Sequence, residues 1–196
     1  MDPVKIVLVI IALVAIAFAI LMVLRKRRSE RLQGKFGPEY EHEVDRAGDR
    51  KRAERELEAR EKRLAKIEIR RLRPDERNRF AEDWNRTQSR FVDEPSKAVD
   101  EAENLVTQVM NARGYPMGDF EQRAADISVH YPKVVSNYRS ARDIAAKNRS
   151  GESTTEELRQ AMVYYRELFE DLLETDKPAP REEVRAAEKA AERGPR

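Results

Sequence analysis

Only a few residue types in this chain of 196 residues could carry out catalysis, and their spacing does not favour it. The chain has no cysteine, which excludes disulfides and thiol chemistry. It has two histidines, and the first, His42, lies among glutamates. A metal site needs three or four convergent ligands, and neither His-x-x-x-His nor His-Glu-x-x-His is present. His130 lies at an expected helix end, where an imidazole commonly caps carbonyl groups, so we predict no metal ligand and no catalytic histidine.

Carboxylates are abundant, as in the pair Glu170 and Asp171, but abundance alone does not indicate acid–base chemistry. That chemistry needs one carboxyl group in an apolar pocket with a shifted pKa. Because 39% of the residues are charged, solvated carboxylates are the expectation here. Glycine-rich phosphate loops and Gly-x-Ser-x-Gly are also absent. We therefore predict no catalytic residue and no cofactor, and an enzyme is not favoured, although it is left open.

One short polar segment, residues 119–126, is richer in polar groups than a helix of its length needs. Arg123 and Asp126 are three residues apart on this helix, which favours an intrahelical salt bridge. The alternative is a patch that binds a protein partner. Its members would be Asp119, Glu121, Gln122, Arg123 and Asp126.

The first 24 residues predict a membrane anchor. Residues 6–24 contain no charged or strongly polar side chain, and a helix of that length is about 28 Å long, against a hydrocarbon core of about 30 Å. A cleaved signal peptide is disfavoured because the apolar stretch is long and no Ala-x-Ala site follows it. We expect a single transmembrane helix that is kept in the mature protein.

Basic residues follow the apolar stretch at once, and they predict its orientation. Lysine and arginine stay on the cytoplasmic side of a membrane span, so we expect the N-terminus outside and residues 25–196 in the cytoplasm. The cluster serves at least as a topology determinant, and contact with anionic lipid headgroups is the further reading. Its members are Arg25, Lys26, Arg27, Arg28, Arg31 and Lys35.

The charge distribution separates two parts of the remaining chain. The net charge is +4 over residues 25–40, +3 over residues 41–73 and −5 over residues 74–196. Charges of both signs are interleaved throughout, which indicates solvated helix faces and not the uniformly basic surface of a nucleic-acid-binding protein.

Hydrophobic periodicity predicts an all-α fold. We expect a hinge at the end of the basic juxtamembrane segment 25–40, a long charged helix over residues 41–73, and a compact bundle of about five helices over residues 74–174. Prolines, glycines and a capping box at Thr154 and Glu157 separate the bundle helices. Residues 175–196 are expected to be a disordered or frayed tail.

Three long phrases within residues 91–173 carry a resemblance to known sequences. They are FVDEPSKAVDEAENLVTQVMNARGYP, DFEQRAADISVHYPKVVSNYRSA and TEELRQAMVYYRELFEDLL. With them, residues 25–174 resemble an uncharacterised bacterial family that combines one N-terminal transmembrane helix with a helical soluble domain. The resemblance implies the same layout and carries no activity or site.

These observations favour a non-enzymatic scaffold or interaction module that holds a protein partner at the cytoplasmic membrane. The first alternative is a membrane-tethered enzyme or small-ligand binder, with its site near Trp84 or on the helix of residues 120–126. The second alternative is a structural stalk or coiled-coil assembly protein that associates through residues 41–73. Homo-oligomerisation stays open, and no nucleic-acid partner is expected.

Overall fold

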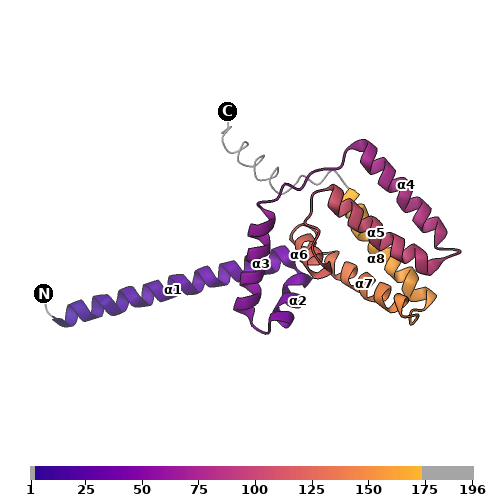
Figure 1. Cartoon of the computed structure of the whole chain (residues 1–196). Helices are drawn as coiled ribbons and strands as arrows, with labels where there is room; N and C mark the ends of the chain where they lie inside the picture. Colours follow the sequence, from indigo (N-terminus) through magenta and orange to yellow (C-terminus); the bar gives the residue numbers. More distant parts are fainter. Residues whose placement is uncertain (1–2, 174–196) are drawn as a thin grey trace, which may run out of the picture. The chain divides into compact units, whose positions relative to one another are not determined.

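Figure 1 shows the computed structural model, which describes the backbone of residues 3–173 and the side chains of residues 11–173. The described part contains helices and no strand, which confirms the prediction of an all-helical protein. The predicted tail over residues 175–196 lies outside the described residues. Contacts divide the chain into two units, residues 1–57 and 58–196, which are described separately below. The eight helices of residues 3–173 are α1 (Pro3–Phe36), α2 (Pro38–Ala47), α3 (Arg50–Leu64), α4 (Pro74–Arg90), α5 (Pro95–Ala112), α6 (Phe120–His130), α7 (Val135–Arg149) and α8 (Thr155–Leu173).

Helix α1 corrects the prediction of a transmembrane helix. Where its side chains are described, the apolar run covers residues 11–24 and ends at Arg25. Fourteen residues extend over about 21 Å of helix, whereas the hydrocarbon core of a membrane is about 30 Å thick. Among the described residues, no helix is both long enough and apolar enough to cross a membrane. The predicted single-pass membrane span is therefore wrong by this criterion.

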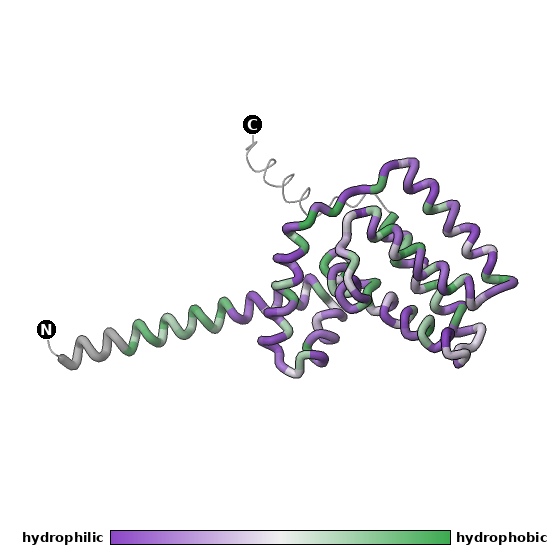
Figure 2. The backbone as a smooth tube through the Cα atoms, in the orientation of Figure 1, coloured by the Kyte–Doolittle hydropathy of each residue, from purple (hydrophilic) through white to green (hydrophobic). Residues whose placement is uncertain are grey.

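The large apolar side chains of residues 11–24 are nevertheless exposed within the chain. Figure 2 shows this run as a hydrophobic stretch of α1 that changes to hydrophilic residues at the arginines. Phe18, for example, is 62% exposed, and Leu24 is 57% exposed. Gly34 lies inside α1, and the break between α1 and α2 is at Gly37, which has a left-handed φ of 51° and precedes the proline that opens α2.

The predicted long helix over residues 41–73 is also wrong, because two breaks divide that segment. Gly48 adopts a left-handed φ of 65° and caps α2 through its N–H, which donates to the carbonyl of Val44. Asp49 then accepts from the N–H of Arg52 at 2.7 Å and starts α3. Helix α3 ends at Leu64, and the following nine residues are not helical.

A buried polar cluster connects the three helices of the first unit. Ser29 of α1 and Tyr40 of α2 donate to the Glu54 carboxylate of α3, at 2.5 and 3.0 Å. Arg50 of α3 donates to the Tyr40 hydroxyl at 2.8 Å and to the Ser29 hydroxyl at 2.6 Å. Burial raises the pKa of Glu54, but the two hydroxyl donors and the charge of Arg50 outweigh that effect and lower it.

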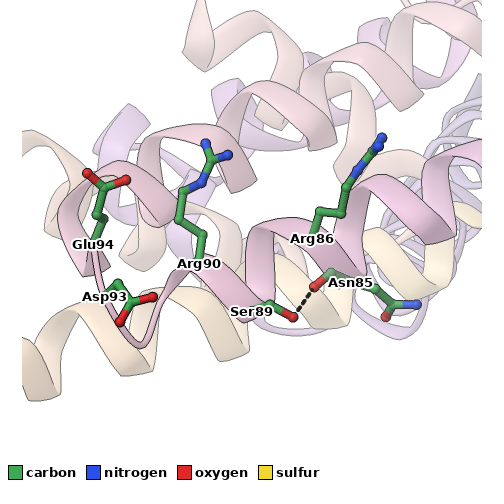
Figure 3. A pocket seen from close by; sticks show the side chains of 6 residues that line it. All are labelled: Asn85, Arg86, Ser89, Arg90, Asp93 and Glu94. Atoms are coloured by element: carbon green, nitrogen blue, oxygen red, sulfur yellow. Dashed lines mark hydrogen bonds between the residues drawn. The ribbon is translucent and has the colours of Figure 1, made fainter.

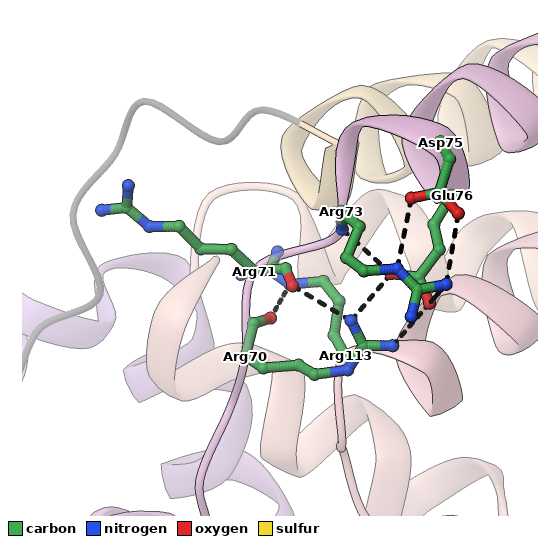
Figure 4. Close-up of polar contacts among 6 residues, drawn as sticks. All are labelled: Arg70, Arg71, Arg73, Asp75, Glu76 and Arg113. Carbon is green, nitrogen blue, oxygen red and sulfur yellow. Dashed lines mark hydrogen bonds and ion pairs between the residues drawn. The ribbon is translucent and has the colours of Figure 1, made fainter.

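The nine residues 65–73 begin with a turn and form a non-helical strap that lies against the end of α5. The N–H of Arg70 donates to the carbonyl of Arg113 at 2.9 Å, and a Cβ at Gly114 would lie only 2.9 Å from the backbone oxygen of Glu68. Gly114 also has a left-handed φ of 89°, so both the close approach and the backbone conformation need glycine. Figure 4 shows the strap arginines and the pairing of Arg70 with Glu76. Arg70 donates two hydrogen bonds to the Glu76 carboxylate, at 2.7 and 2.8 Å.

Helices α4 to α8 form the bundle of the second unit. Helix α5 packs on α4 and α8, α8 packs on α7, and α6 packs on α7. The apolar stripes of α5 and α8 are buried, because helices with one apolar face exclude water by packing those faces together. Trp84 of α4 stacks on Phe169 of α8, with ring centroids 4.7 Å apart. The predicted capping box is confirmed by hydrogen bonds between Thr154 and Glu157.

Candidate functional site

The polar patch predicted on residues 119–126 lies at the start of α6. Asp119 is the N-cap of this helix, and its carboxylate accepts from the N–H of Gln122 at 2.8 Å. Gly118 precedes the cap, and a Cβ there would lie 2.8 Å from the side chain of Gln122. The chain therefore enters α6 closely packed against its own first turn, and Asp119 has a structural contact of its own.

Asp126 lies in the interior of the second unit and is fully buried. Its Oδ1 accepts from Nη2 of Arg63 at 2.6 Å and from the side-chain amide of Gln122 at 3.1 Å. Arg63 belongs to the last turn of α3, 63 residues earlier in the chain. The ion pair expected between Arg123 and Asp126 is thus replaced by a tertiary ion pair between α3 and α6.

The two remaining charged members of the patch lie beside α7. Glu121 pairs with Arg139, with a nitrogen-to-oxygen distance of 2.6 Å, and its side chain is 63% exposed. Arg123 donates to the backbone carbonyl of Gly118 at 2.7 Å. Its Nε is buried and has no hydrogen-bond partner.

Residues that the sequence analysis did not single out complete this surface. Arg142 of α7 lies over the ring of Phe120, 5.5 Å from its centroid, and forms an ion pair with Glu103 of α5 at 3.0 Å. Phe120 in turn packs against Tyr138, with ring centroids 5.0 Å apart. We call the group Phe120, Glu121, Arg123, Arg139 and Arg142 the α6–α7 patch. Only the i, i+3 spacing of Arg139 and Arg142 could have indicated the α7 side from sequence.

Tyr138 provides the buried floor beneath this patch. Burial raises the pKa of its hydroxyl, and Arg123 and Thr107 beside it offset only part of that rise. Tyr165 of α8 is its neighbour, with ring centroids 6.3 Å apart, and burial raises the pKa of that hydroxyl as well. Both tyrosines stay protonated at neutral pH and are available as hydrogen-bond donors.

The predicted basic cluster belongs to α1, in the first unit. Lys26 lies one turn from Glu30, with a nitrogen-to-oxygen distance of 3.9 Å and both side chains exposed. Arg28, Arg31 and Lys35 have contacts within the chain. The cluster thus combines exposed cations with others that have local partners, and its contact with lipid headgroups stays a prediction.

A separate open hollow of about 720 Å³ lies where α4 meets α5 (Figure 3). Arg86, Arg90 and Glu94 project from its rim, and each already pairs with a neighbour, namely Asp83, Glu101 and Lys97. The hollow is open to solvent and lined by charged and polar side chains, whereas small-molecule sites enclose most of the ligand among apolar groups. Its lining residues are Asn85, Arg86, Ser89, Arg90, Asp93 and Glu94.

Neither of the two regions predicted for a small ligand, around Trp84 and on the helix of residues 120–126, forms an enclosed site. The ring of Trp84 is covered by Phe169, and the polar residues of α6 make the contacts described above. Within the described part of the chain, no group of three His, Cys, Asp or Glu residues is arranged to hold a metal ion. Comparisons with protein-family models, with curated proteins and with solved structures found no match to this chain.

Proposed function

We infer that this protein is a non-enzymatic interaction module whose helical bundle holds a protein partner. The observation that carries this proposal is the α6–α7 patch. Two helices bring charged groups and one aromatic ring together there, on a floor of packed tyrosines. Protein interfaces commonly centre on arginine and aromatic side chains, which combine hydrogen bonding with a large contact area.

The two alternatives receive less support from the same contacts. A small-ligand binder needs an enclosed site, and the hollow beside Arg86 and Arg90 is open and charged. A stalk built on residues 41–73 needs one continuous helix, and that segment is divided at Gly48 and again after Leu64.

A location at the cytoplasmic membrane, with residues 25–196 in the cytoplasm, stays a prediction that no observation tests. That predicted location depends on the predicted membrane span, so it is not part of the proposal. Homo-oligomerisation is likewise untested, and the proposal concerns a different protein as the partner of the bundle.

Site-specific photo-crosslinking in cells tests the proposal. A photoreactive amino acid replaces Glu121 in the patch, and the matched control replaces Glu156 on α8, whose side chain is 72% exposed. We expect a discrete crosslinked protein only from position 121, and the identified partner should recover the chain in the reciprocal purification. Equal products from both positions, or none from position 121, would contradict a partner at the α6–α7 patch.

A further inference from the structure

The acidic side chains around the start of α6 are already occupied by contacts within the chain. Asp119 caps the helix, Glu121 pairs with Arg139, and Asp126 is buried against Arg63. At the α6–α7 patch itself, the three guanidinium groups of Arg123, Arg139 and Arg142 face two carboxylates, Glu121 and Glu103. The patch therefore has an excess of one positive charge, although residues 74–196 are acidic as a whole.

The same patch has buried donors without acceptors. Nε of Arg123, and Nε and Nη1 of Arg142, are buried and make no hydrogen bond of good geometry, even though Arg142 lies within ion-pair distance of Glu103. The hydroxyl of Tyr165, which is fully buried, also has no partner, whereas the hydroxyl of the fully buried Tyr138 lies beside Arg123 and Thr107, which lower its pKa. Buried polar groups in proteins are nearly always hydrogen-bonded, so the unpaired atoms of Arg123, Arg142 and Tyr165 need an explanation.

These donors lie close together. Arg142 lies 5.5 Å from the ring centre of Phe120, the ring centre of Tyr138 lies 5.0 Å from it, and Arg123 is near enough to Tyr138 to affect its pKa. The unpaired atoms can all donate, and those of Arg123 and Arg142 belong to cations. A single acceptor with several lone pairs and a negative charge suits this arrangement better than a neutral group.

We propose that the α6–α7 patch binds a carboxylate, the side chain of an acidic residue on the protein partner, through Arg123 and Arg142. The planar guanidinium presents parallel N–H groups that match the two oxygens of a carboxylate. Rotation of the two arginine side chains, each only partly buried, brings their N–H groups to the ligand, and the buried Tyr138 lies beside Arg123. This inference rests on the proposed function, because it specifies the chemistry of the partner at the same surface.

Titration of the isotope-labelled full chain tests the inference, with mild detergent to cover the apolar side chains of α1. The probe is hexaglutamate, with hexalysine and inorganic phosphate as separate arms, at low salt because exposed charges are screened. We expect hexaglutamate alone to shift the amide resonances of α6 and α7. Binding by hexalysine would overturn the proposal, as would phosphate binding at least as tightly as hexaglutamate, which would indicate a general oxyanion site.

Two double variants separate the patch from surface charge in general. R123Q/R142Q removes both guanidiniums, and the matched control R159Q/R166Q removes two arginines of α8 that form ordinary exposed pairs. We expect the patch variant to bind hexaglutamate at least about tenfold more weakly, because hydrogen bonds to charged groups have that magnitude, while the control retains wild-type affinity. Equal affinity of the two variants would overturn the assignment.

A conservative variant keeps the test decisive if R123Q/R142Q does not fold. Arg142→Lys keeps the charge and loses the planar fork, so it should bind hexaglutamate more weakly than the wild type. Unchanged affinity of Arg142→Lys would overturn the role of the fork. If hexaglutamate fails while crosslinking from position 121 succeeds, the interaction module stands and only the carboxylate inference falls. If hexaglutamate binds while crosslinking from position 121 gives no product, the proposed protein partner is contradicted.

Discussion

Two apolar segments of similar composition differ in burial, since one is exposed and the other forms part of the core. Residues 11–24 of α1 and the stripe of α8 are both rich in large apolar side chains, yet Leu13 is 61% exposed and Leu168 is fully buried. The difference lies in periodicity. Helix α8 has apolar residues on one face, which one set of neighbours can cover, whereas residues 11–24 are apolar all around the helix. Hydrophobicity alone therefore does not predict which residues form the core.

The largest expected effect on stability comes from a substitution that tests this difference in burial directly. Leu168→Ala should lower the free energy of unfolding by about 3 kcal/mol, because it leaves a cavity in the bundle. Leu13→Ala should change it by less than about 0.5 kcal/mol, because that side chain has no covering neighbours among the described residues. Urea unfolding followed by far-ultraviolet circular dichroism measures both. A similar loss for the two variants would show that residues 11–24 contribute to the folded core.

The next comparison is between a buried and an exposed ion pair. Arg63→Ala leaves the carboxylate of Asp126 buried without its cation, so we expect a loss of about 2 kcal/mol, moderated because Arg63 itself is partly exposed. Arg159→Ala, whose exposed partner is Glu156, should cost less than about 0.5 kcal/mol. Equal effects in the same unfolding experiment would exclude a special role for the pair between α3 and α6.

A smaller difference is expected between two glycines that differ in their surroundings. Gly114→Ala combines a left-handed φ of 89° with a contact of 2.9 Å to the strap, and should cost about 2 kcal/mol. Gly151→Ala has a φ of 77° and open space around it, so about 1 kcal/mol is expected from the backbone alone. If thermal melts show no difference between the two, the strap does not press against the end of α5.

The smallest effect is a pH dependence of the exposed strap. Hydrogen bonds from Arg70, then from the N–H of Arg73, lower the pKa of Glu76 from 4.5 to about 2. A lowered folded-state pKa stabilises the fold above the unfolded value, so this contribution is present above about pH 4.5 and is lost as the pH falls towards about 2. Glu76→Gln should weaken the decline in melting temperature over that window. A carboxyl resonance of Glu76 that titrates near 4.5 would contradict the pairing.

Local signals predicted much of the bundle. Pro74 and Pro95 each open a helix, Gly114 follows the end of α5, and Thr154 with Glu157 caps α8. These features depend on residues within one or two helical turns, so their effect is readable from spacing alone. The errors at α1 and at residues 41–73 arose where composition was used without such signals, since the Glu-, Lys- and Arg-rich run continued past the break at Gly48 and the end of α3.

At the candidate site, too, the local features were predictable from sequence and the long-range contacts were not. Sequence alone indicated a polar segment at residues 119–126, and Asp119 as its helix cap is a local property. Only the tertiary structure decided that Asp126 pairs with Arg63, that Arg142 lies over Phe120 and that Arg123 lies beside Tyr138. These partners are far apart in the chain, and burial in the bundle selects them. Helix boundaries follow from short-range backbone and capping preferences, whereas the sign of the charge at a surface depends on which side chains the packed interior has already neutralised.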